Sequence, residues 1–216
     1  MTEENKIIIE LIISSISLLL SLIAIVITIA QLVISNKQSL FDKRIKLYSL
    51  ANDLCTLYNE NKGSITNRKD EVYFECETVF SYMTNNSNLA EASKVINNTL
   101  KQTEQFVFLS KIENLKKEGN KTRFLFKGKT MKYVEMFVND YADALMGLYQ
   151  YKVLLDDMKK YSANYEKVDL EKAIKDFKEP EHRKTLFAKL DKLNNTFELM
   201  NKSNCMKRME NKIKLY

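Results

Sequence analysis

The hydrophobic pattern is most uneven near the N-terminus, where an uncharged run precedes a chain of mixed apolar and charged residues. Residues 11–34 contain no charged side chain, a run of 24. A helix of this length extends roughly 36 Å, enough to cross a hydrocarbon core of about 30 Å. A cleaved signal peptide ending near TIAQ is the alternative, but the flank MTEENK is not basic and the run is long for a signal peptide. We therefore expect a retained transmembrane helix over 11–34, after a short N-terminus over 1–10.

Polar residues within this run recur at intervals of three and four, which places them on one helix face. The six positions are Ser14, Ser17, Ser21, Ala24, Thr28 and Gln31. Small residues let helices approach closely in lipid, and hydroxyl or amide groups can bond across the interface. A 3.5-residue period indicates left-handed, coiled-coil-like pairing, so we expect an oligomerisation seam between copies of the chain. Two alternatives stay open: hydroxyls that bond back to their own helix, and a stripe that lines a small pore.

Flanking charges set the expected orientation. Four cations follow the span closely (Lys37, Lys43, Arg44 and Lys46), whereas Lys6 alone precedes it. The positive-inside rule then places the N-terminus outside and the C-terminal part in the cytoplasm. Three widely spaced cysteines without a C-x-x-C pair fit a reducing cytosol. Abundant Lys, Asn and Ile indicate an AT-rich genome, so we expect a single-pass protein of a bacterial cell membrane.

Helical spacing of apolar residues continues beyond the span. No Gly or Pro occurs between the span and Gly63, and Leu47, Ala51, Leu54 and Tyr58 recur at helical intervals. We therefore expect a juxtamembrane amphipathic helix over 35–62, with Phe41 and Tyr48 as core residues of the helical domain.

A short motif in this helix resembles a known group of proteins. Its residues are Gln38, Phe41, Asp42, Arg44 and Tyr48, directly after the span. The arrangement is similar to bacterial single-span membrane proteins of unknown function that carry a glutamine and then F-D-x-R-x-x-x-Y in the helix after the span. The resemblance covers about the first sixty residues and implies a membrane-tethered helical bundle. It also implies occurrence in mobile-element and anti-phage loci.

The rest of the chain also predicts helices, because it has only four glycines and one proline. The expected helices are 70–83, 89–117, 131–158, 169–177 and 181–200, with a polar loop at 84–88. The fold class is therefore all-α: an N-terminal transmembrane helix continuing into a cytoplasmic helical bundle, with the bundle domain over 63–201. A basic tail over 202–216 is expected to fray.

One stretch combines basic and aromatic residues in a pattern that suggests binding. The candidate residues are Lys121, Arg123, Phe124, Phe126, Lys127, Lys129 and Lys132, with Gly119 and Gly128 expected to bracket a loop or short hairpin. Cations neutralise phosphates while aromatic rings stack on bases, so the stretch is suited to single-stranded nucleic acid. Anionic lipid at the inner leaflet fits equally, and so does a solvated connection whose Phe residues pack into the bundle.

Candidate chemistry is sparse. His182 is the only histidine and stands in a charged segment, and the chain has no Walker A, GxGxxG, H-E-x-x-H or nucleophile-elbow motif. We therefore expect no enzyme activity, metal or cofactor. The expected function is a membrane-anchored interaction or scaffold protein that oligomerises through its span and binds a protein partner. A membrane-tethered nucleic-acid binder and an oligomeric pore-forming effector are the alternatives.

Overall fold

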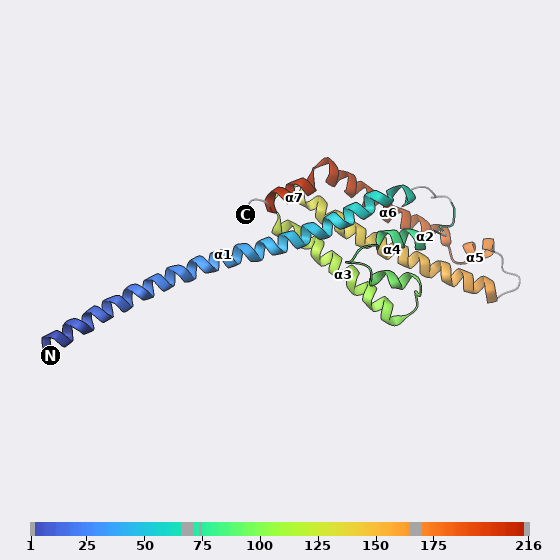
Figure 1. The fold of residues 1–216 in the computed structure, drawn as a ribbon. Coiled ribbons are helices and arrows are strands. Elements are labelled where there is room, and N and C mark those ends of the chain that lie inside the picture. The colour runs from blue at the N-terminus through green and yellow to red at the C-terminus, as the bar shows by residue number, and fades with distance from the viewer. Residues whose placement is uncertain (1–2, 66–70, 74, 165–169, 214–216) are drawn as a thin grey trace. The chain divides into compact units, whose positions relative to one another are not determined.

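The computed structural model of the chain describes residues 3–65, 71–73, 75–164 and 170–213. Every regular element within these residues is a helix, which confirms the all-α prediction. Figure 1 shows them in chain order: α1 (Glu3–Ile65), α2 (Cys76–Met83), the 3₁₀ helix η1 (Ala92–Ile96), α3 (Gln102–Leu125), α4 (Met131–Asn164), α5 (Leu170–Asp176), α6 (Glu179–Lys202) and α7 (Cys205–Ile213).

The chain divides into two compact units, Met1–Lys43 and Arg44–Tyr216. In the first unit, α1 leaves every side chain exposed from residue 3 through residue 39. Among the described residues, α1 alone is long and apolar enough to be a candidate membrane span. The apolar side chains of residues 3–39 are therefore not part of a hydrophobic core, whereas many apolar side chains of the second unit are buried in one.

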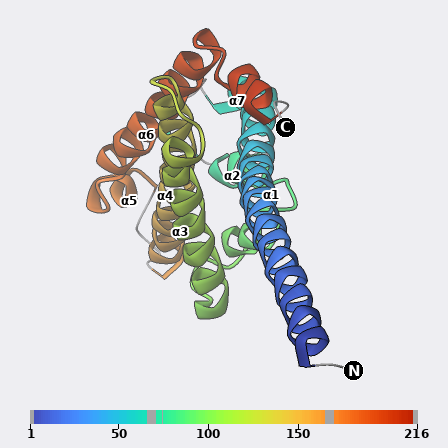
Figure 2. The same cartoon turned by 90° about the vertical axis from the view of Figure 1, so that its left-hand side faces the viewer.

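In the second unit, α4 is the central helix. It packs against α3 on one side and α6 on the other, as Figures 1 and 2 show from two directions. The later part of α1 joins this core through Tyr58, whose ring lies 4.9 Å from Phe197 and 6.3 Å from Phe137 between centroids. The Tyr58 hydroxyl also donates a hydrogen bond to Asn194 Oδ1 at 3.1 Å. Aromatic packing of this kind adds about 0.5–1.5 kcal/mol per pair to the burial of the rings.

The expected helix over 89–117 is wrong in its first half. Only η1 is helical before Gln102, where α3 begins. The break is fixed at Thr99, whose carbonyl accepts hydrogen bonds from Gln105 Nε2 at 2.7 Å and from Tyr149 OH at 3.0 Å. Its hydroxyl donates to Asp156 Oδ2 at 3.0 Å. Side chains of α3 and α4 therefore hold this segment outside the regular helical hydrogen bonding.

The expected helix over 70–83 is shorter in the structure, because α2 begins at Cys76; residues 70 and 74 lie outside the described residues. The helix expected over 131–158 is confirmed and extends to Asn164. The last long helix begins at Glu179 instead of Glu181, so Pro180 occupies its first turn, where a missing N–H costs no hydrogen bond. The expected helix over 169–177 corresponds to α5, with residue 169 outside the described residues.

The expectation of a frayed tail is wrong over Cys205–Ile213, which forms α7. Cys205, Met209 and Ile213 stand four residues apart and are all buried. The Cys205 thiol donates a hydrogen bond to the Thr130 carbonyl at 3.3 Å, which ties α7 to the segment between α3 and α4. Burial of one apolar face stabilises this short helix in spite of its basic composition. Residues 214–216 of the expected tail lie outside the described residues.

Candidate functional site

The predicted seam lies on the exposed first unit, and two of its hydroxyls bond within their own helix. Ser21 Oγ donates to the Ser17 carbonyl and Thr28 Oγ1 to the Ala24 carbonyl, each at 2.8 Å. Ser15, which stands off the seam, bonds in the same way to Leu11 at 2.8 Å. These bonds satisfy the hydroxyl protons and leave oxygen lone pairs free to accept. The seam residues Ser14, Ser17, Ser21, Ala24, Thr28 and Gln31 are all exposed.

The residues predicted to lie next to the membrane divide between the two units. Lys37, Asp42 and Lys43 are exposed and Phe41 is half-buried in the first unit, while Arg44, Lys46 and Tyr48 belong to the second. Arg44 Nε donates to the Leu125 carbonyl at 2.9 Å, and its guanidinium lies 5.8 Å from the centre of the Phe126 ring. Arg44 therefore satisfies a carbonyl at the C-terminal end of α3.

The basic and aromatic stretch is not the loop or hairpin that its glycines suggested. Helix α3 continues through Gly119 to Leu125. Gly119 lets α3 approach α4 closely, because a Cβ at this position would lie 3.0 Å from Asn139 Oδ1. Phe126 is buried in the core, so it is unavailable for binding. Phe124 is 76% exposed and lies 5.4 Å from the Arg123 guanidinium.

Two of the cations in this stretch form ion pairs with acidic residues of the protein. Lys121 pairs with Glu118 at 2.7 Å and Arg123 with Glu135 at 3.4 Å. Lys127, Lys129 and Lys132 are exposed. The stretch therefore presents Phe124 and several cations at the surface. These residues lie on the last turns of α3, in the short connection to α4 and on the first turn of α4.

A second group of cations, Arg44, Arg208 and Lys212, lies close together in the second unit. Lys212 Nζ lies 3.6 Å from the position that a side chain at Gly128 would take. Burial, and then the positive charges of Arg44 and Arg208, lower the pKa of Lys212. The sequence places Arg208 and Lys212 in a basic tail that was expected to fray, so their grouping with Arg44 was not predicted. The four-residue spacing of Cys205, Met209 and Ile213 is the signal that would have found α7.

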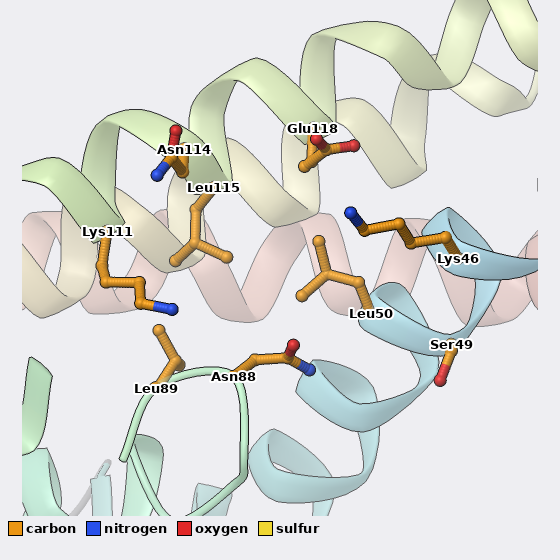
Figure 3. Close-up of a pocket in the computed structure, with 9 residues that line it drawn as sticks. All are labelled: Lys46, Ser49, Leu50, Asn88, Leu89, Lys111, Asn114, Leu115 and Glu118. Atoms are coloured by element: carbon orange, nitrogen blue, oxygen red, sulfur yellow. The ribbon is translucent and has the colours of Figure 1, made fainter. Parts of the chain in front are cut away.

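A groove crosses the second unit between α1, α3 and the segment before η1. It encloses about 540 Å³ and is lined by Lys46, Ser49, Leu50, Asn88, Leu89, Lys111, Asn114, Leu115 and Glu118 (Figure 3). Leu89 and Leu115 are buried and Leu50 is half-buried, so the floor is apolar. A groove of this size falls in the range that binds ligands in other proteins.

Two lysines reach into this groove from opposite walls. Lys46 projects from α1 and ends between Leu50 and Glu118, and Lys111 projects from α3 and ends near Leu115 and Leu89 (Figure 3). Glu118 is the one acidic residue of the lining, and it is bonded to Lys121 at 2.7 Å. Asn88 Nδ2 lies 3.4 Å from Asp53 Oδ2. The groove therefore combines an apolar floor with a net positive rim.

Buried acids elsewhere in the unit are used in ion pairs. Asp140 is held by Lys192 at 2.8 Å and Glu179 by Arg183 at 3.4 Å. His182 is exposed. Across the described part of the chain, no three His, Cys, Asp or Glu side chains are grouped so that they could hold a metal ion.

Over the residues that the structure describes, the protein is all-helical with one candidate membrane-spanning helix. No protein-family model, curated protein or solved structure matches the chain.

Proposed function

We propose that this protein is a membrane-anchored interaction protein of a bacterial cell membrane. Its span holds the chain in the bilayer, its seam joins copies, and its bundle binds a protein partner in the cytoplasm without catalysis. The observation that carries the proposal is the exposure of an uncharged helix over residues 11–34. Each Leu or Ile left in water forfeits roughly 1.5–3 kcal/mol, so the fourteen such side chains of this run favour lipid by tens of kcal/mol.

Two further features support the proposal. Cations gathered after the span favour a cytoplasmic bundle by the positive-inside rule. The resemblance of residues 38–48 to helices of tethered bacterial proteins suggests a role in a mobile-element or anti-phage locus.

Cross-linking in native membranes tests the seam. We expect the wild-type chain to give a dimer or higher species with a membrane-permeable cross-linker. The double substitution Ser21→Leu and Gln31→Leu should reduce that species at least several-fold, because it removes a small residue and an amide from the interface.

Ser15→Leu is the matched control, because Ser15 bonds to its own helix in the same way but lies off the seam. It should leave cross-linking unchanged. A monomeric wild-type chain, or equal loss in the control and the seam variant, would contradict oligomerisation through this face.

Binding of single-stranded nucleic acid is the second candidate function. It is favoured by the exposure of Phe124 next to Arg123 and the nearby Lys127 and Lys129. Binding of an oligothymidine by the full-length protein should weaken steeply with salt and fall further in the variant Lys127→Glu with Lys129→Glu. A flat salt response, or unchanged binding in that variant, would remove this candidate.

A further inference from the structure

The groove between α1 and α3 has features that select one kind of ligand. Its floor is three leucine side chains, which favour contact with an aliphatic group over contact with water. Asn88 and Asn114 stand at the edge and can exchange hydrogen bonds with a peptide backbone.

The charges of the groove point to an acidic ligand. Lys46 and Lys111 face the same space from opposite walls (Figure 3), and neither has an ion-pair partner among the described residues. Glu118 is the carboxylate of the lining, and it forms an ion pair with Lys121, which does not line the groove. A ligand with two carboxylates therefore neutralises two cations that the protein itself does not pair.

The lining also argues against other anionic ligands. It contains no aromatic side chain on which a nucleobase could stack. Three of its nine lining residues are leucines and the other six are polar or charged, which does not suit a pair of acyl chains. A protein segment is the anionic partner that suits an apolar floor, two cations and two carboxamides together.

We propose that this groove binds an acidic, leucine-containing segment of a protein partner, whose carboxylates contact Lys46 and Lys111 and whose aliphatic side chains cover Leu50, Leu89 and Leu115. This inference rests on the proposed function in one respect, that the bundle binds a protein partner.

Fluorescence anisotropy with the full-length protein in phosphatidylcholine nanodiscs tests it. The probe is a labelled peptide of repeated Leu-Glu-Glu-Leu, and the matched peptide carries glutamine in place of glutamate. We expect saturable binding of the acidic peptide and at least tenfold weaker binding of the glutamine peptide. The variant Lys46→Glu with Lys111→Glu should lose at least tenfold in affinity.

Two further variants separate the groove from overall charge. Lys175→Glu with Lys184→Glu makes the same charge change at exposed positions of α5 and α6, and should keep the affinity within about twofold. Asn114→Trp fills the groove from an exposed position without changing its charge, and should weaken binding at least fivefold with unchanged helical circular dichroism.

Several outcomes would overturn the proposal. They are no binding of the acidic peptide, equal loss in the α5–α6 control, and unchanged binding in Asn114→Trp. Displacement of the peptide by phosphatidylglycerol nanodiscs would assign the groove to lipid, and displacement by an oligothymidine would assign it to nucleic acid. Cross-linking through the seam is measured on the same variants, so a refuted groove with intact cross-linking leaves the membrane assembly standing.

Discussion

At the scale of single residues, burial controls the chemistry of the thiols. It raises the pKa of Cys55 and Cys76 to about 12, and at Cys76 the neighbouring Glu77 carboxylate adds to the effect. In the unfolded chain these thiols ionise near pH 8.5–9, so above that pH the unfolded state loses protons that the folded state keeps. The free energy of unfolding should therefore fall with rising pH, by about 1.4 kcal/mol per pH unit for each thiol.

Alkylation measures this directly. The thiolate is the reactive form, so at pH 8 iodoacetamide should modify Cys76 roughly a hundred- to a thousandfold more slowly in the folded protein than in urea. Mass spectrometry of the modified peptides reports each cysteine separately. Rapid modification of Cys76 under native conditions would show that its site is open to solvent.

A buried carboxylate ties α4, α6 and the segment before α2 together. Tyr151 OH accepts a hydrogen bond from the Tyr73 backbone N–H at 3.0 Å and donates one to Glu179. Arg183 Nε lies 3.4 Å from the same Glu179 carboxylate. Burial raises the pKa of Tyr151, and the hydrogen bond to Glu179 raises it further, so the phenol stays protonated and donates.

Removing that carboxylate should be costly. Glu179→Ala leaves the Tyr151 hydroxyl without its acceptor and Arg183 without its partner, so we expect the free energy of unfolding to fall by about 3–5 kcal/mol. Urea unfolding followed by circular dichroism measures the change. Glu181→Ala, at an exposed position in the same turn, should stay within about 0.5 kcal/mol of wild type. Equal effects of the two substitutions would contradict the structural role of Glu179.

At the scale of elements, the sequence predicts most accurately the helices that pack against several neighbours. Helix α4 contacts both long neighbours and buries most of its apolar residues, so its 3.6-residue pattern is strong. The break before α3 left no such signal, because it depends on Gln105 and Tyr149 reaching the Thr99 carbonyl. Only the folded chain brings Tyr149 to that carbonyl.

The candidate sites also differ in whether a local sequence pattern or tertiary packing forms them. The uncharged run and its polar face are local patterns and were readable directly from the sequence. The groove was not, because Lys46 and Lys111 stand in different helices and meet only through packing. Phe124 and Phe126 show the same limit, because nothing in the sequence distinguishes them, yet Phe126 is buried and Phe124 is exposed.

Helix α7 provides a test of packing at this scale. Met209 is fully buried, so Met209→Ala should lower the free energy of unfolding by about 2–5 kcal/mol. Lys207→Ala, at an exposed position of the same helix, should change it by less than about 0.5 kcal/mol. If both variants unfold at the wild-type urea concentration, the docking of α7 is incorrect.

At the scale of the whole molecule, two units with opposite relations to solvent share one chain. The second unit buries a continuous aromatic and aliphatic core. The first exposes the uncharged, largely apolar residues 11–34, which water does not favour. This contrast is the physical basis for proposing a membrane anchor joined to an interaction domain.

The most direct test is to ask where the two units lie in bacterial cells. Full-length protein with a C-terminal tag is expressed, membranes are extracted with alkaline carbonate, and spheroplasts are treated with protease before and after permeabilisation. We expect the protein to stay in the carbonate-resistant pellet and the tagged bundle to be digested only after permeabilisation. Release by carbonate would contradict the span, and digestion of the bundle in intact spheroplasts would contradict its cytoplasmic orientation.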